Sequence, residues 1–336
     1  MGSHRASVYT VQPLIAMARR TQSGTGRARH VGTVRAPAEA PDCQSARGTG
    51  IVFSMLRSTF QLVPGLGPTR ERRLWSAGVA AWSDFMAAPA PVGSGRAYSR
   101  LRLGVSDAME ALDRGDVTRL ANALPRSEHW QLFEAFGADT AYLDIETNND
   151  VWKRESISAI GLFDRSGPRF LLAGRDLHLF PELARCWKVL VTFNGLSFDV
   201  PILRRAFPDW TPPACHIDLR HLLTRLGHRG GLKRIEDEIE SLNLSRPWHL
   251  RRIDGWDACN LFRRGRNGDR KALRLFAEYN LYDVVNLRTL MAYGYNAQAQ
   301  VEIARAPELS AHVHLLPVPE RGDVLYDVSK ILLGLQ

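Results

Sequence analysis

The stretch AYLDIETNND, residues 141–150, decides how the rest of the chain is interpreted. Its Tyr, Leu and Ile residues favour a β-strand, so the stretch predicts a buried strand. Asp144 and Glu146 stand two positions apart in it, and side chains at this spacing point to the same face of a strand. Two neighbouring carboxylates repel each other, and burying an unpaired charge is costly. A positive partner is therefore needed at this point of the fold.

The length and charge of the chain set broad limits on its class. With 336 residues, of which 45% are hydrophobic, the chain is long enough for about two domains. Its net charge of +9 favours a polyanionic partner such as nucleic acid. Residues 1–54 supply five of these nine charges, because they contain seven Arg and only two acidic residues. The rest of the chain is only mildly basic.

Cysteine spacing and hydropathy argue against several other classes of protein. Cys43, Cys186, Cys215 and Cys259 are far apart and form no CxxC pair, which indicates neither a zinc knuckle nor a disulfide framework. No apolar run approaches the ~18 residues of a membrane span. We therefore expect a soluble, cytoplasmic protein that has no membrane partner.

Residues 1–54 are rich in Gly, Ser, Thr and Ala and show no sustained hydrophobic periodicity. This composition is typical of a disordered segment. Two alternatives remain, namely an Arg-rich transit peptide and a mis-called start, with translation beginning at Met55. We interpret residues 1–54 as a disordered or mis-called N-terminal extension.

Residues 55–136 are predicted to form a helical module that contains a glycine hairpin. In LVPGLGPTRERRLW, residues 62–75, Gly65 and Gly67 precede Pro68, which suits the first turn of a helix. Glycines let the backbone approach a phosphate, and free amides at a helix N-terminus favour an anion. The stretch resembles a helix-hairpin-helix motif, which implies that Gly65 and Gly67 bind nucleic-acid backbone without reading its sequence. The alternative is an ordinary pair of helices with no ligand.

From residue 137 the pattern changes to alternating strands and helices, which is typical of a layered α/β domain. The first three strands follow closely enough to predict an antiparallel meander. Strands are predicted at 140–146, 156–164, 169–174, 188–194 and 214–219, and helices at 181–187, 198–207, 219–227, 232–242, 255–264 and 271–294. Residues 296–336 form a C-terminal tail whose end could be a helix or a strand.

Two further acids stand where a core would not need them. Asp199, in VTFNGLSFDVPIL, begins a helix just after a buried strand. Asp283 lies four residues after Tyr279, so these two side chains share one helix face. Together with Asp144 and Glu146, these carboxylates can converge only if cations neutralise them. All-oxygen ligands suit Mg²⁺ or Mn²⁺, and two such ions serve phosphodiester hydrolysis by in-line displacement.

The motifs DxE, NGxxFDxP and YxxxD occur in this order at Asp144–Glu146, Asn194–Pro201 and Tyr279–Asp283. This order resembles the DEDD 3′→5′ exonucleases of the ribonuclease H-like (DnaQ-like) superfamily, and more narrowly the YprB-type proteins. Glu278 stands where the His branch of that superfamily has histidine, so the match is to the Tyr (DEDDy) branch. The resemblance covers about residues 138–292.

The resemblance also implies a role for each matching residue. Asp144, Glu146, Asp199 and Asp283 would hold two Mg²⁺ or Mn²⁺ ions. Tyr279 would orient the nucleophilic water, and Asp144 would bridge both ions. Thr147 and Asn194 would contact the substrate.

Several positions are ambiguous. Relatives have a small residue soon after the threonine that matches Thr147, where they hold the 3′-terminal nucleotide, whereas here Asn148 follows. We interpret His216 as a structural histidine, because the site needs hard oxygen donors. Asp218 is either a support for the site or a simple strand-end acid.

We therefore predict a ribonuclease H-like α/β domain at residues 137–295, with a mixed five-stranded sheet of order 3-2-1-4-5. The helical module at 55–136 precedes it. The predicted function is a metal-dependent nuclease, most specifically a 3′→5′ exonuclease, and the hairpin favours DNA slightly over RNA. The alternative is a nucleic-acid-binding protein that keeps the fold with little or no catalysis. The sequence leaves the oligomeric state open.

Overall fold

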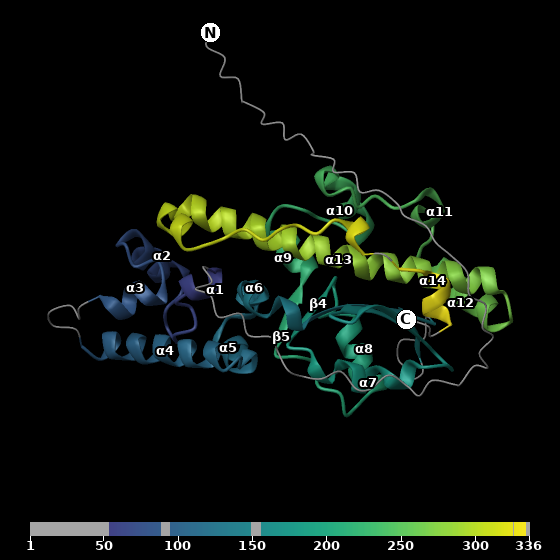
Figure 1. Ribbon diagram of the computed structural model, residues 1–336, viewed down its shortest axis with the longest axis horizontal. Helices are drawn as coiled ribbons and strands as arrows, with labels where there is room; N and C mark the ends of the chain where they lie inside the picture. The colour runs from purple at the N-terminus through teal and green to yellow at the C-terminus, as the bar shows by residue number, and fades with distance from the viewer. Residues whose placement is uncertain (1–53, 89–94, 149–155, 325, 334–336) are drawn as a thin grey trace, which may run out of the picture. The chain divides into compact units, whose positions relative to one another are not determined.

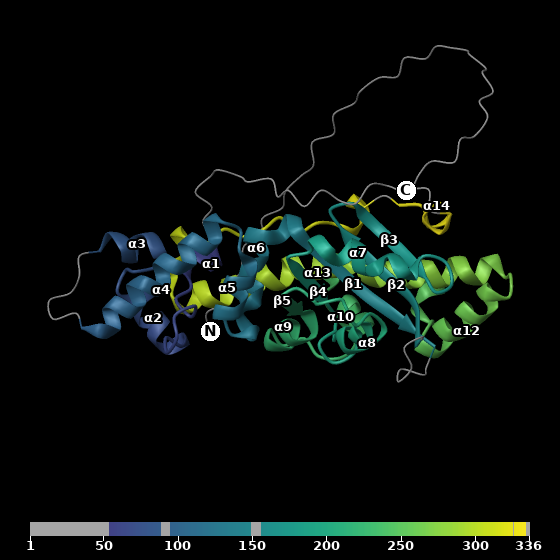
Figure 2. The ribbon, with the colours of Figure 1, turned by 90° about the horizontal axis from the view of Figure 1, so that it is seen from below.

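The computed structural model describes residues 54–88, 95–148, 156–324 and 326–333, so the expectations for residues 1–53 lie outside it. A mixed five-stranded sheet has the order β3-β2-β1-β4-β5, as predicted. Figure 1 shows the sheet within the chain, and Figure 2 labels its five strands. Its strands are β1 (Thr140–Thr147), β2 (Ile157–Asp164), β3 (Gly167–Leu172), β4 (Val189–Thr192) and β5 (Cys215–Asp218). Since β1 is the central strand, its side chains have elements packed on both sides.

The register of the sheet confirms the predicted meander. β1 pairs antiparallel with β2, and β2 pairs antiparallel with β3. β4 continues the sheet parallel to β1, and β5 lies parallel to β4. In this register Asp144 stands opposite Gly161, and the pairing shifts between Glu146 and Thr147. The regular pairing of β1 is therefore interrupted at the end of the strand that carries the two acids.

Side-chain alternation along β1 separates two layers of core. Leu143 and Ile145 pack with residues of α7 (Phe180–Leu183) and α8 (Asp199–Ala206). Tyr142 points into the core that contains residues of α9 (Leu219–Arg225) and α13 (Arg270–Arg305). Asp144 and Glu146 share the face of Tyr142, because they lie two and four positions after it. The acids of β1 therefore face the helices of the second layer.

The remaining helices of this region are α10 (Leu232–Glu238), α11 (Trp248–Arg251) and α12 (Gly255–Arg266). The one at α11 was not predicted, because four residues carry no measurable periodicity. Figure 2 shows α12 beside the far ends of β1 and β2. The Cys259 thiol of α12 donates a hydrogen bond to the Thr147 carbonyl at 2.9 Å, which links α12 to the end of β1.

The long helix α13 differs most from the sequence-based prediction. We expected a helix over 271–294, but it continues to Arg305. A Cβ added at Gly294 would lie 2.9 Å from Leu222 Cδ2, so this glycine permits close packing of α13 on α9 instead of ending the helix. Pro307 follows the true end, where it suits a helix stop. Near the chain end, α14 (Val328–Leu332) shows that the tail packs back as a helix with Val328 and Ile331 buried.

The N-terminal part is helical, as predicted. Glu71 is buried in α2, and its carboxylate accepts hydrogen bonds from Thr59 Oγ1 (2.7 Å), the Phe60 amide (2.7 Å) and Gln61 Nε2 (2.6 Å). These bonds tie α2 to the chain before the glycine hairpin. The helices are α1 (Met55–Ser58), α2 (Pro68–Ser76), α3 (Trp82–Ala87), α4 (Arg96–Asp113), α5 (Val117–Ala123) and α6 (Phe133–Phe136).

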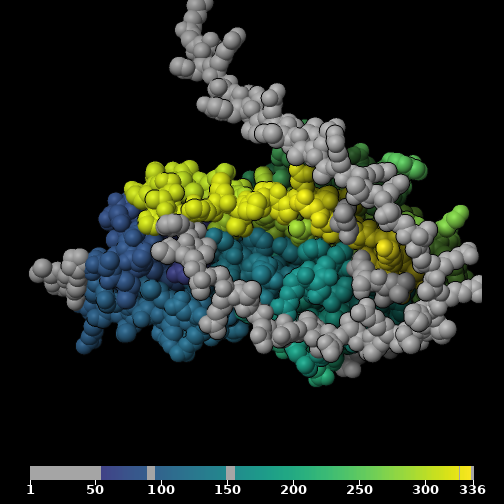
Figure 3. All heavy atoms as spheres, viewed as in Figure 1, coloured from purple at the N-terminus to yellow at the C-terminus, as the bar shows by residue number. Residues whose placement is uncertain are grey.

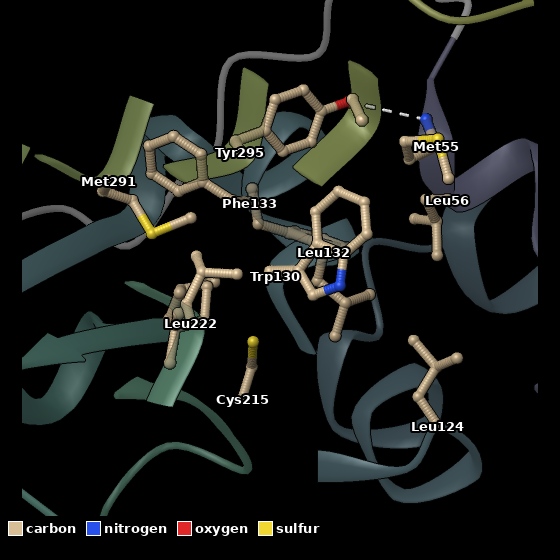
Figure 4. Close-up of a cluster of buried hydrophobic side chains, with 14 of the residues drawn as sticks. Met55, Leu56, Leu124, Trp130, Leu132, Phe133, Cys215, Leu222, Met291 and Tyr295 are labelled. Atoms are coloured by element: carbon tan, nitrogen blue, oxygen red, sulfur yellow. Dashed lines mark hydrogen bonds between the residues drawn. The ribbon is translucent and has the colours of Figure 1, made fainter. Parts of the chain in front are cut away.

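One hydrophobic core joins these N-terminal helices to α13. Trp130 packs edge-on against Tyr295 with ring centroids 5.6 Å apart, and the Met55 amide donates to the Tyr295 hydroxyl at 3.5 Å (Figure 4). The same hydroxyl donates to Glu134 at 2.8 Å. In Figure 3 the yellow-green end of α13 lies over the blue N-terminal helices. The C-terminal half of α13 therefore supports the helical module.

Hydropathy of the helices adds one negative finding. Among the residues that the structure describes, no helix is both long enough and apolar enough to cross a membrane.

Candidate metal centre

Three carboxylates meet where β1 faces α13. Asp144 and Glu146 come from β1, and Asp283 comes from α13. One carboxylate oxygen of each lies within 4.8 Å of the others. Alternation along the strand puts the first two on the face toward α13, and α13 brings the third from about 140 residues later in the chain.

Asp199, the fourth predicted ligand, lies beside this cluster but outside the group of three. It begins α8, and its Oδ1 accepts the backbone N–H of Ile145 at 3.0 Å. Ile145 stands between Asp144 and Glu146, and the charge of Asp199 raises the pKa of both neighbours. The structure thus brings all four carboxylates into one electrostatic neighbourhood.

Burial raises the pKa of Asp144, Glu146 and Asp199, and neighbouring acids raise it further. Burial and the charges of Asp283 and Asp199 raise the pKa of Glu146 to about 8. Burial raises the pKa of Asp199 to about 7. The pKa of Asp144 is raised by burial and by its three acidic neighbours. A group of oxygen donors that repel one another in this way fits a hard divalent cation.

Tyr279 lies one helical turn before Asp283. Burial, followed by the charges of Asp283, Glu146 and Asp144, raises the pKa of its phenol. The Lys233 ammonium lies 4.9 Å from the centre of its ring. Because the phenol keeps its proton at neutral pH, it can donate a hydrogen bond but cannot act as a general base.

The sequence analysis missed Arg246. Its side chain is only 3% exposed, and it donates to Asp283 and to both oxygens of Glu236, the latter at 2.7 and 3.1 Å. Glu236 also accepts from Asn286 Nδ2 at 2.9 Å. This hydrogen-bond network holds the Arg246 guanidinium against Asp283 and so orients the Asp283 carboxylate. No local pattern distinguishes Arg246 in a chain so rich in arginine, so the sequence offered no signal for it.

Asn280 was matched to the third motif, but its contact was not foreseen. Its Nδ2 donates to Asp144 Oδ2 at 2.8 Å. The side chain reaches across β2 at Gly161, where an added Cβ would lie 2.0 Å from Asn280 Oδ1. A glycine inside a strand often marks such a close approach, and this was the available signal.

The loop that leads to Asp199 is held by Asp218. This carboxylate accepts the backbone N–H groups of Asn194 and Leu196 at 2.7 and 3.1 Å, so it supports the loop. Asn194 has a left-handed backbone with φ +66°, and its Oδ1 accepts from Arg220 Nη1 at 2.7 Å. Asn194 is therefore tied to Asp218 and, through its side chain, to Arg220 of α9.

The other singled-out residues do not belong to the group of three acids. His216 Nε2 is 2.9 Å from Thr192 Oγ1, and burial lowers its pKa to about 4, as suits a neutral structural histidine. Thr147 ends β1. Gly65 has φ +85° in the hairpin, and Gly67 is the N-cap of α2, so both belong to the helical module.

The first prediction concerns pH and stability without divalent ions. From pH 7 to 8.5, the free energy of unfolding should fall, because the folded protein keeps protons on Glu146 (pKa about 8) and Asp199 (pKa about 7) that the unfolded chain has lost. Each retained proton lowers the free energy of unfolding by up to ~1.4 kcal/mol for every pH unit of increase. The lowered pKa of buried His216 makes stability rise with pH, but only at pH values below the ordinary pKa of histidine. The range from pH 7 to 8.5 therefore avoids its contribution. Thermal unfolding in EDTA measures the effect.

The matched control for this experiment is Glu146→Gln, which removes the titrating group and keeps its shape. Its stability should depend less on pH than that of the wild type. Added Mn²⁺ should also flatten the wild-type profile, since the ion displaces the same protons. Equal slopes for the two proteins in EDTA would contradict the assignment.

The second prediction concerns Gly161→Ala. The new methyl group should displace Asn280 from Asp144, cost ~1–3 kcal/mol of stability by overpacking and weaken Mn²⁺ binding about 10–100-fold, as is usual when a supporting partner of a ligand is lost. Mn²⁺ titration and thermal unfolding test both effects. Gly137→Ala is the control, because nothing lies within 4 Å of a Cβ at that position.

A double variant separates the two effects of Gly161→Ala. Combining it with Asn280→Ala removes the shortest contact and leaves the one with Val284 Cγ2 at 2.9 Å, so stability should recover in part while Mn²⁺ affinity stays low. Wild-type Mn²⁺ affinity in Gly161→Ala would show that Asn280 does not support Asp144.

Comparison with known proteins agrees with this geometry. A family model described as RNase_H superfamily matches residues 141–295, the region that contains all four carboxylates and Tyr279. Neither a curated protein nor a solved structure gives a significant match. The match and the sheet order β3-β2-β1-β4-β5 together show that this region has a ribonuclease H-like, nuclease-type fold.

Proposed function

We propose that this protein is a metal-dependent nuclease that hydrolyses phosphodiester bonds, and more specifically a 3′→5′ exonuclease. The observation that carries the proposal is the meeting of Asp144, Glu146 and Asp283 within 4.8 Å in a nuclease-type fold. Asp199 beside them completes the set of acids expected of the DEDD group. The direction of digestion rests on the resemblance of the three motifs to that group.

The residues present fit two Mg²⁺ or Mn²⁺ ions held by Asp144, Glu146, Asp199 and Asp283. When bound, such ions acidify a water molecule and stabilise the leaving oxygen of a phosphodiester. The chain itself supplies the alignment of the ligands. Asn280 holds Asp144, and the Ile145 amide holds Asp199.

Tyr279 has a separate role in this proposal. Its phenol remains protonated, so it would orient the attacking water through its hydroxyl and leave proton removal to the metal centre. By resemblance, tyrosine at this position supports the proposal that the protein is of the DEDDy branch.

The helical module would contribute to substrate binding. Gly65 and Gly67 precede α2, which carries the exposed Arg70, Arg72 and Arg73. Glycines let the protein backbone come close to a phosphate, and the helix N-terminus and the arginines attract its negative charge. This combination suits the sugar-phosphate backbone of a nucleic acid. This hairpin slightly favours DNA, and a side-by-side assay on DNA and RNA strands decides the substrate.

The alternative function is nucleic-acid binding with little or no catalysis. The bond between Arg246 and Asp283 is the observation that favours it, because a cation already lies on one of the four acids. The two functions differ in turnover, so degradation of labelled strands with Mg²⁺, with Mn²⁺ and with EDTA separates them.

The third prediction concerns Asp144→Asn. The variant should lose cleavage of labelled single strands in Mg²⁺ or Mn²⁺, because a ligand is lost while the packing is kept. Its thermal stability in EDTA should equal or exceed that of the wild type, since one repelling charge is removed. Strands labelled at the 5′ or the 3′ end show the direction of digestion. Near-wild-type cleavage by the variant would refute the metal mechanism, and no cleavage by the wild type would favour the binding protein.

The fourth prediction concerns Tyr279→Phe, which deletes the hydroxyl and keeps the ring. The kcat should fall about 10–100-fold if one orienting hydrogen bond contributes ~1.4–2.7 kcal/mol to the transition state. Mn²⁺ affinity should remain, because the four carboxylates are intact. Single-turnover cleavage and Mn²⁺ titration give the two readouts. An unchanged rate would make Tyr279 an ordinary core residue, and lost Mn²⁺ binding would make it a support for Asp283.

A further inference from the structure

Residues 246–256 are attached at two points to the candidate metal centre. At the start, the buried Arg246 donates to Asp283. Toward the end, the Lys233 ammonium donates to the Ile253 carbonyl while it lies against the ring of Tyr279. Between these points, Arg251 Nε donates to the Arg246 carbonyl at 2.8 Å. The position of this segment is therefore tied to that of the acids.

This segment presents two exposed tryptophans, although that residue is usually well buried. Trp248 is 80% exposed and Trp256 is 63% exposed. Other tryptophans of the described residues, such as Trp75, Trp82 and Trp130, are 2% exposed. Large exposed aromatic side chains on a fixed segment mark a binding surface.

A neighbouring histidine helps to orient Trp248. The ring of His249 lies 5.9 Å from the ring of Trp248 at an interplanar angle of 79°. His249 Nε2 is in turn 3.1 Å from Glu278, the residue before Tyr279. The indole thus stands beside a side chain that is itself linked to α13.

The charge around the tryptophans is positive. Residues 246–266 contain six Arg and two acidic residues. On α12, Arg263 and Arg266 line a hollow of about 370 Å³ together with Asn148, which follows β1. Cys259, which also lines this hollow, donates a hydrogen bond to the Thr147 carbonyl. The hollow therefore lies next to the C-terminal end of β1.

We propose that Trp248 and Trp256 form a stacking surface for unpaired nucleobases, and that Arg263 and Arg266 contact the phosphates of the same strand. The inference rests on the proposed function and narrows its substrate to single-stranded nucleic acid. Aromatic faces beside a basic groove are how proteins hold single strands without reading sequence. In a duplex the bases stack on each other, so the indole faces would have no partner there. The positive surroundings favour this ligand over a protein surface.

Binding of fluorescein-labelled oligo-dT and oligo-U, measured by anisotropy in EDTA, tests the proposal without cleavage. Trp248→Ala and Trp256→Ala should each weaken binding about 5- to 150-fold, which is the range that one stacked base contributes. Trp248→Phe and Trp256→Phe should recover most of the affinity, because a flat ring remains. Leu103→Ala is the matched control, since this leucine is 70% exposed on α4, outside the proposed surface. A blunt duplex should bind all variants equally.

The outcomes separate this inference from the proposed function. Wild-type affinity in both Ala variants, or equal losses for duplex and single strand, would overturn the stacking surface. If the wild type degrades strands in Mg²⁺ while the Ala variants bind normally, the nuclease stands and the surface fails. If the Ala variants lose binding but the wild type never cleaves, the surface stands and the nuclease fails. Thermal unfolding of each variant confirms that the fold is intact.

Discussion

The mutual repulsion of buried carboxylates is the constraint on which the rest of this structure depends. Asp144, Glu146 and Asp283 converge between the strand β1 and the helix α13, and burial and their mutual charges raise their pKa values. Such an arrangement costs stability unless positive charge compensates it. The surroundings are built accordingly, with hydrogen-bond donors on Asp144 and Asp199 and the Arg246 guanidinium on Asp283.

Arg246 compensates only part of this charge. Its guanidinium also forms an ion pair with Glu236, which is buried as well. The single positive charge of Arg246 is therefore divided between two carboxylates. With all of its carboxyls ionised the cluster would therefore carry excess negative charge, which retained protons offset in the metal-free protein and which cations would offset when bound. The same network limits where Asp283 can point, because Glu236 and Asn286 hold the guanidinium in place.

The helix α13 connects the two parts of the described chain. Its first half carries Tyr279, Asn280 and Asp283 to the candidate metal centre. Its second half carries Tyr295 into the core shared with Met55 and Trp130. A rigid helix links the position of the hairpin module to that of the acids, which suits a protein in which both would contact one strand. The domain limits and the cytoplasmic location inferred from the sequence remain predictions.

The sequence by itself determined the parts that depend on local spacing. Alternation in β1 put Asp144 and Glu146 on one face, the helical repeat put Tyr279 beside Asp283, and the order of the motifs indicated the sheet. Only the tertiary structure decided the contacts between distant residues. Arg246 pairs with Asp283, which lies 37 residues later in the chain. Gly161 of β2 leaves the space that the Asn280 side chain of α13 occupies. Gly294 continues a helix that local propensity would end, because close packing against Leu222 outweighs the low helix propensity of glycine. Exposure of Trp248 and Trp256 was equally hidden, since burial depends on which neighbours the whole fold supplies.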